Sequence, residues 1–127
     1  MPVRNIVAGA AALAAALSFS VPAMSAGALS VAKCGGYGYS INISSIEEAR
    51  RIALRKCESE GNEDCRLVLD FHSFCVAFAY DEGSNCGAEG WGSGPEKGAA
   101  EDSAIRQCIN HSGGNCTVKT SICDAGD

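Results

Sequence analysis

The same cysteine spacing occurs twice in this chain, and it constrains the fold more than any other feature. Residues 57–65 read CESEGNEDC and residues 108–116 read CINHSGGNC, so seven residues separate the cysteines in each stretch. Each stretch follows a helix-like run and precedes an apolar, strand-like run. A bridge across a loop of about nine residues would join helix to strand and stabilise the fold by roughly 2.5 kcal/mol in the chain-entropy model. The spacing therefore predicts the disulfides Cys57–Cys65 and Cys108–Cys116.

The similarity between the two stretches extends beyond their cysteines. When Cys57 is aligned with Cys108, the apolar and basic positions of the preceding helices coincide, as Ala49 with Ala100 and Ala53 with Ala104. Each copy reads strand, turn, strand, helix, cysteine pair, strand. Residues 27–74 and 75–124 are therefore predicted to be two copies of one unit within a single disulfide-rich domain.

The residue patterns of the predicted helices and strands suggest how they pack. The segment SSIEEARRIALRKC (44–57) begins with a capping box, either Ser44 with Glu47 or Ser45 with Glu48. Alanines on both helices favour close packing of helix on sheet, and CVAFAY (75–80) places large side chains on one face and alanines on the other. We expect an α/β fold of the α+β type, in which the two strand–strand–helix–strand units form one antiparallel sheet with both helices on one face.

The N-terminal segment has the composition of a secretory signal peptide. Arg4 precedes an apolar run over residues 6–17, and Pro22 with small residues follows it. A membrane-spanning helix needs about 20 residues, and this run is shorter. We therefore predict a signal peptide over residues 1–25, a domain over 26–127 and no membrane span after cleavage. Since all eight cysteines follow the signal peptide, we expect a secreted or periplasmic protein with oxidised thiols.

The charge of the chain limits the classes of partner. Its formal net charge is −5, and no basic stripe is present. Nucleic acid and anionic membrane surfaces are therefore disfavoured as partners. A cationic protein is compatible with the acidic balance, although acidity also serves solubility.

Two glycine-aromatic stretches, GYGYS (36–40) and GWGSG (90–94), precede the two helices. Together with the repeated helix–Cys–x7–Cys–strand pattern, they resemble the bacterial secreted domain of unknown function 4189, over about residues 27–124. The resemblance implies a small α/β domain with antiparallel strands. It implies no established activity, and it supplies no catalytic residues to transfer.

The other four cysteines also fall at equivalent places in the two copies. Cys34 and Cys86 lie in turns, whereas Cys75 and Cys123 lie at strand ends. Symmetry therefore favours Cys34–Cys86 and Cys75–Cys123, among the 105 pairings that eight cysteines allow. A zinc site usually has C-x2–4-C spacing and a redox site C-x-x-C, and neither is present. We expect structural disulfides, with no cofactor and no metal.

Aromatic side chains beside glycines are the candidate binding surface. Tyr37, Tyr39 and Trp91 lie in the two equivalent strands, where an aromatic face can stack on a sugar or a partner side chain. The alternative is that they fill the core. If helices cover one face of the sheet, its other face would be the natural binding surface. The partner expected there is a cationic protein or a cell-envelope glycan.

These features favour a non-catalytic binding module over an enzyme. One alternative is a small secreted hydrolase in which His72 and Asp70 form an acid–base pair. No nucleophile motif such as G-x-S-x-G accompanies that pair. A second alternative is a structural protein of the cell envelope without a discrete ligand.

Overall fold

The computed structural model describes residues 25–124, so the predicted signal peptide lies outside the described residues except for Ser25. Both halves of this region have the predicted order strand, strand, helix, strand. The first half contains β1 (Ala26–Val31), β2 (Tyr37–Ile43), α1 (Ile46–Ser59) and β3 (Arg66–Phe71). The second half contains β4 (Cys75–Asp81), β5 (Glu89–Gly94), α2 (Lys97–Asn110) and β6 (Cys116–Cys123). A short 3-10 turn, η2 (Lys33–Gly35), follows β1.

The strands form two antiparallel sheets, so the prediction of one sheet was wrong. Each half makes its own three-stranded sheet, with the order β2-β1-β3 in the first half and β5-β4-β6 in the second. The central strands hold equivalent registers, because Leu29 of β1 lies opposite Tyr39 and Phe78 of β4 lies opposite Trp91. The α+β class and the antiparallel pairing are as expected.

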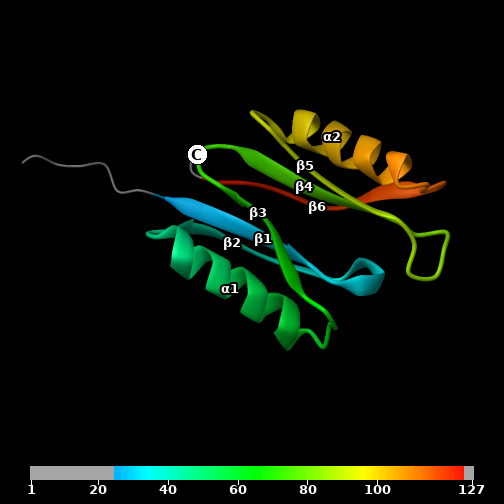
Figure 1. Cartoon of the computed structure of the whole chain (residues 1–127). Coiled ribbons are helices and arrows are strands. Elements are labelled where there is room, and N and C mark those ends of the chain that lie inside the picture. The colour runs from blue at the N-terminus through cyan, green and yellow to red at the C-terminus, as the bar shows by residue number, and fades with distance from the viewer. Residues whose placement is uncertain (1–24, 125–127) are drawn as a thin grey trace, which may run out of the picture.

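The two sheets pack face to face, with one helix outside each sheet (Figure 1). Their facing sides make the main core, which consists of Leu29, Val31, Phe71, Val76, Phe78 and Tyr80. The helices therefore lie on opposite outer faces rather than on one face. The physical reason is that each sheet has one face of large apolar side chains, and the two faces leave water by covering each other. The second sheet face, expected to be a binding surface, is the core.

Small residues allow each helix to lie close to its sheet. Ala28 of β1 packs with Ala49 and Ala53 of α1, and the alanines of β4 pack with those of α2 in the same way. A Cβ atom at Gly38 would overlap the backbone of α1, so this close approach requires glycine. The buried Ser40 hydroxyl donates to Ala49 O over 2.7 Å, which satisfies a polar group inside the layer.

The four disulfides have the pairing that the repeat predicts. Cys57–Cys65 and Cys108–Cys116 join the end of each helix to the following strand. Cys34–Cys86 joins the two halves through their turns. Cys75–Cys123 joins β4 to β6 within the second half, where the two residues lie opposite each other. Four disulfides indicate an oxidising environment.

Neither helix within residues 25–124 has the length and apolar character needed to cross a bilayer.

Candidate functional site: a groove along strand β2

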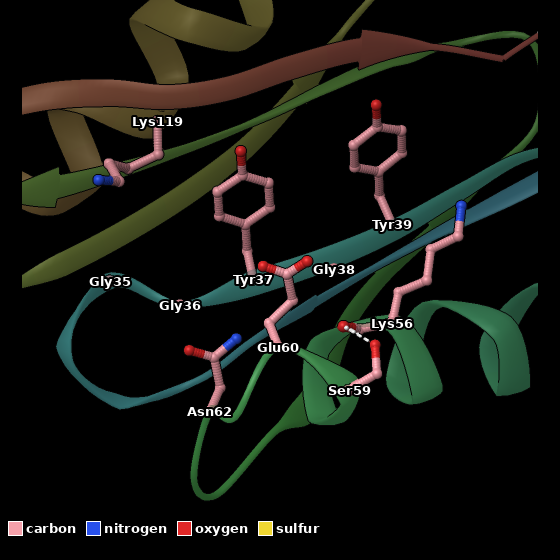
Figure 2. A pocket seen from close by; sticks show the side chains of 10 residues that line it. All are labelled: Gly35, Gly36, Tyr37, Gly38, Tyr39, Lys56, Ser59, Glu60, Asn62 and Lys119. Carbon is pink, nitrogen blue, oxygen red and sulfur yellow. Dashed lines mark hydrogen bonds between the residues drawn. The ribbon is translucent and has the colours of Figure 1, made fainter.

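A groove of about 540 Å³ runs along the outer edge of β2, and we call it the tyrosine groove (Figure 2). It lies between the end of α1 and strand β6 of the opposite sheet. Its lining comes from β2 and the turn before it, the end of α1 and the loop after it, and one residue of β6: Gly35, Gly36, Tyr37, Gly38, Tyr39, Lys56, Ser59, Glu60, Asn62 and Lys119.

Two half-buried tyrosines form one wall of the groove. Figure 2 shows both rings standing on β2 and pointing toward β6, from which Lys119 extends. The Tyr37 ring lies 6.1 Å from the Phe78 ring, so its inner side belongs to the core. The Lys56 ammonium lies 5.7 Å from the centre of the Tyr39 ring, a cation–π distance. Lys119, on the other side of the groove, is paired with the Glu82 carboxylate at 3.1 Å. The wall is therefore aromatic, and Lys56 supplies a positive charge that is unpaired among the described residues.

The alternation of GYGYS explains why these rings face the groove. Gly38 and Ser40 point toward α1, where only small side chains fit. Because successive side chains of a strand point to opposite faces, Tyr37 and Tyr39 must point away from α1. Gly35, which precedes them, has a φ of 88° and lies against the Tyr80 ring, so a side chain at this position would be both strained and crowded.

The main chain of β2 also faces the groove. Ala32 N donates to Gly36 O over 2.8 Å at the start of the β1–β2 ladder. In an antiparallel ladder hydrogen-bonded pairs alternate with non-bonded pairs, so Tyr37 and Tyr39 occupy non-bonded positions opposite Val31 and Leu29. Their N–H and C=O groups therefore point away from β1, toward the outer edge of the sheet.

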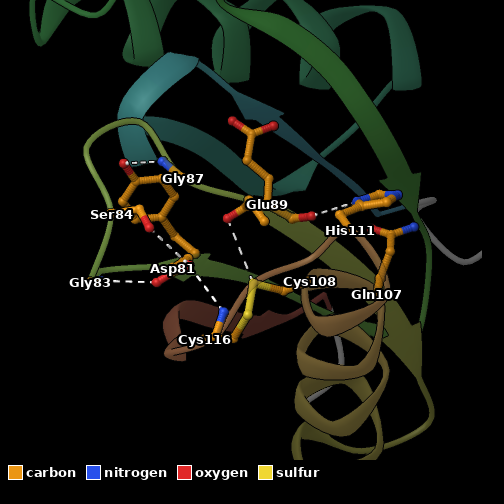
Figure 3. The surroundings of a disulfide bond; sticks show 12 residues. Asp81, Gly83, Ser84, Gly87, Glu89, Gln107, Cys108, His111 and Cys116 are labelled. Atoms are coloured by element: carbon orange, nitrogen blue, oxygen red, sulfur yellow. Dashed lines mark hydrogen bonds between the residues drawn. A yellow bond between two sulfur atoms is a disulfide. The ribbon is translucent and has the colours of Figure 1, made fainter.

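The equivalent edge, on β5, is covered by side chains of α2. Trp91 N donates to Gln107 Oε1 over 2.6 Å, and His111 Nδ1 donates to Glu89 O over 2.9 Å. Figure 3 shows His111 and Gln107 extending from the end of α2 beside Glu89. Arg66, from β3 of the first half, binds the Glu89 carboxylate at 2.6 Å and lies 5.8 Å from the Trp91 ring. We call this region the closed groove.

The three aromatic residues predicted to form one binding surface therefore lie in two separate places. Tyr37 and Tyr39 share one groove, whereas Trp91 lies on the opposite side of the sandwich, where β5 faces β3. Sequence reasoning did not identify Lys56, Glu60 or Lys119 as part of a site. Lys56 and Glu60 occupy the positions of α1 that match Gln107 and His111 of α2, so the aligned repeat contained a signal for them.

The structure places the predicted acid–base residues in two different networks. Asp70 accepts hydrogen bonds from Arg50 Nε at 2.8 Å and Arg50 Nη2 at 2.6 Å. His72 Nδ1 contacts Ser25 O and lies 4.0 Å from Asp124. The Ser25 hydroxyl donates to Asp124 Oδ1 over 2.9 Å rather than to the imidazole, so this cluster does not have the hydroxyl-to-base geometry of an activated nucleophile.

Asp81 fixes the turn at the end of the β4–β5 hairpin (Figure 3). Its carboxylate accepts hydrogen bonds from Gly114 N at 3.1 Å, Gly83 N at 2.9 Å and the Ser84 hydroxyl at 3.3 Å. The N–H groups of Gly114 and Gly83 lower the pKa of Asp81, because they stabilise its charged form. The hairpin is thereby tied to the loop between Cys108 and Cys116.

Comparison with known proteins identifies the family of this domain. The sequence profile described as Domain of unknown function (DUF4189) matches residues 26–123. The chain belongs to this family.

Among solved structures, the DUF4189 chain is similar to the NMR structure of Rv1813c from Mycobacterium tuberculosis. The TM-score is 0.56 and the sequence identity 21%, over 98% of this chain and 100% of that chain. At this identity the likeness supports the fold alone. A search of curated proteins gave no match.

Proposed function

We propose that this DUF4189 domain is an exported binding module that holds its partner in the tyrosine groove. The observation that carries the proposal is the contrast between two equivalent places in the molecule. The groove along β2 is open and aromatic, whereas the one along β5 is covered by Gln107, His111 and Arg66. A surface that the same scaffold closes in one half and leaves open in the other is available for a ligand.

The compartment follows from the disulfides and the predicted signal peptide. All eight cysteines of the chain are paired. Disulfides form and persist outside the cytosol, so the domain would act in the periplasm or beyond the cell. The bridges and the close-packed layers would hold the groove in a fixed shape, which reduces the entropy lost when a partner binds.

The side chains of the groove favour an uncharged or acidic partner. Lys56 brings one ammonium group to the Tyr39 ring, whereas Lys119 is paired with Glu82 at 3.1 Å. The Lys56 charge would oppose a cationic group beside Tyr39, whereas tyrosine faces and hydroxyls suit a sugar or a peptide. A cell-envelope glycan or a peptide without excess positive charge therefore fits this site better than the cationic protein that the net charge alone allows.

The test is a binding screen with the oxidised, exported protein. An array of microbial glycans and a library of linear peptides would be probed with the wild type and with Tyr39→Ala. We expect Tyr39→Ala to weaken binding by about tenfold or more, because alanine removes an aromatic anchor. Leu67→Ala is the matched control, since it removes a 38% exposed apolar side chain from β3, outside the groove. Equal binding by the wild type and Tyr39→Ala would contradict the proposed site.

A further inference from the structure

We infer that the tyrosine groove takes an extended peptide segment of a partner protein, which pairs with β2 as an additional strand. This inference rests on the proposed function and specifies the ligand class of the same groove. It depends on the main chain of β2 as well as on the tyrosine rings.

The edge of β2 offers hydrogen-bonding groups in the pattern of a strand. At Tyr37 and Tyr39 the ladder to β1 leaves two N–H and two C=O groups directed outward. Within residues 25–124, no side chain binds them as Gln107 and His111 bind the edge of β5. Such an edge is a template for another extended chain, whose main chain supplies affinity while alternate side chains supply specificity.

The other three sheet edges are less suitable for pairing. The β5 edge is covered by side chains of α2. Strands β3 and β6 each contain a bulge, at Val68 and at Lys119, where the register to the central strand shifts. A bulge interrupts pairing along an edge. In β2 the register shifts only beyond Ser40, and it is regular from Tyr37 to Tyr39, the part that lines the groove.

The groove also determines which side chains the peptide would carry. A peptide residue beside Tyr37 or Tyr39 would direct its side chain to the same face, against the rings, so an apolar or aromatic residue fits there. Lys56 makes no ion pair with the described residues and lies at the groove wall, where a peptide carboxylate would complement its charge. A second copy of this chain is disfavoured, because each copy carries a formal charge of −5.

The first experiment uses a library of linear peptides of about ten residues, selected on the oxidised protein. The best peptide would be resynthesised with single N-methyl groups placed along its main chain. We expect methylation at alternate residues to raise Kd by about tenfold, because each such residue loses a hydrogen bond to β2 and gains a clash. Methylation at the intervening residues, whose N–H groups point away from β2, should have little effect.

The second experiment transfers the closed edge to the open one. Lys56→Gln together with Glu60→His would place at the end of α1 the two residues that cover β5. We expect this double variant to weaken peptide binding by about thirtyfold, since its side chains would compete for the main chain of β2. Lys56→Ala together with Glu60→Ala is the matched control, because it removes the same charges without supplying new partners. It should lose only the charge contribution of Lys56, up to about fivefold in affinity. Equal weakening by the two double variants would contradict competition for the main chain of β2.

Amide hydrogen exchange provides a direct readout of strand pairing. In the free protein the Tyr39 amide should exchange faster than the Trp91 amide, whose hydrogen bond to Gln107 protects it. Peptide binding should slow exchange at Tyr39 and leave Trp91 unchanged.

The outcomes separate this inference from the proposed function. Alternating sensitivity to N-methylation, with slower exchange at Tyr39, supports strand addition. Peptides that require Tyr39 but tolerate every N-methyl group would overturn strand addition and leave the proposed groove in place. If glycans bound, no peptide did, and Tyr39→Ala abolished the glycan binding, strand addition would likewise be overturned and the proposed groove would remain. If neither library bound the protein, both the strand addition and the proposed function would be wrong.

Discussion

The edges of β2 and β5 occupy equivalent places in the molecule, yet one is open and the other is covered. Where α2 carries Gln107, which accepts a hydrogen bond from the edge of β5, α1 carries Lys56, which lies over a tyrosine ring instead. Where β5 carries Glu89, which binds Arg66, β2 carries Tyr37. The layers beneath these residues are alike in the two halves. The comparison shows that a few exposed positions decide whether this fold presents an open groove. The small buried residues between helix and sheet, which the two halves share, maintain the fold.

The largest effect we expect comes from the core that the two halves share. Phe78→Ala should lower the free energy of unfolding by about 3–5 kcal/mol, since it removes a fully buried ring between the sheets. Leu29→Ala, at the equivalent position of the first half, should cost about 2–5 kcal/mol. Chemical denaturation followed by circular dichroism would measure both. Because the core is common, each variant should still unfold in one transition, and two separate transitions would show that the halves are independent.

The two disulfides that join a helix to the following strand provide the next comparison. Replacing Cys57 and Cys65 by alanine should lower the free energy of unfolding by about 2.5 kcal/mol, and replacing Cys108 and Cys116 should lower it equally, because both loops have the same length. Thermal unfolding of the two double variants would measure the losses. If the two losses in free energy of unfolding differed by more than about 1 kcal/mol, loop closure alone could not account for the stabilisation by these disulfides.

We expect Arg66 to be the residue that covers the closed groove along β5. Arg66→Ala removes the ion pair to Glu89, whose side chain is 16% exposed, and the contact with the Trp91 ring. We expect a loss of about 1 kcal/mol in stability. Since Trp91 is the only tryptophan of the chain, acrylamide quenching of its fluorescence should also increase. Arg106→Ala, on the exposed side of α2, is the control, and equal quenching in both variants would contradict the role of Arg66.

The smallest effect concerns acid, and it should depend on Asp81 of the second half. The pKa of Asp81 is lowered in the folded protein, so its carboxylate stabilises the fold above its unfolded pKa of about 3.9, and this contribution disappears as pH falls through the lower folded value. The Tm of the wild type should therefore fall more steeply below about pH 4 than that of Asp81→Asn. The first half has Ala32 at the equivalent position, and its turn is held by the ion pair between Lys33 and Asp64 at 2.9 Å, which lowers the pKa of Asp64. Asp81→Asn should therefore leave the acid response of that turn in hydrogen exchange unchanged. Parallel acid slopes for the two proteins would exclude this role of Asp81.

Much of the fold could be predicted from patterns of residue size. The alternation of alanines with Val76 and Phe78 identified both faces of β4, and the alanines of each helix identified its packing partner. Cys57–Cys65 and Cys108–Cys116 followed from the repeated spacing, and Cys34–Cys86 followed from equivalent turns of the two units. Cys75–Cys123 has the expected pairing, but it joins neighbouring strands of one half rather than equivalent positions of two. The helix cap could be located only to within one residue, and the structure selects Ser45, whose side chain accepts a hydrogen bond from Glu48 N at 3.1 Å.

The separation into two sheets was not predicted, although its physical cause is present in the sequence. Once each helix is assigned to the alanine face of its strands, the large side chains of the other face still need cover, and the second unit is what provides it. The groove was harder to predict. Lys56 lies in the last turn of α1 and Glu60 directly after it, both exposed, and their importance depends on the distance from α1 to the edge of β2, which no local pattern encodes.

The face-to-face arrangement of the sheets means that the main core belongs to neither half alone. Leu29 and Val31 are covered by the second half, and Val76 and Phe78 by the first. A chain with a single strand–strand–helix–strand unit would therefore have to associate with a second copy to fold, and such a homodimer would have two identical grooves. Joining the two units in one polypeptide removes that symmetry, because each groove can then acquire its own residues. Because the two units belong to one chain, Arg66 can close one groove while the other stays open.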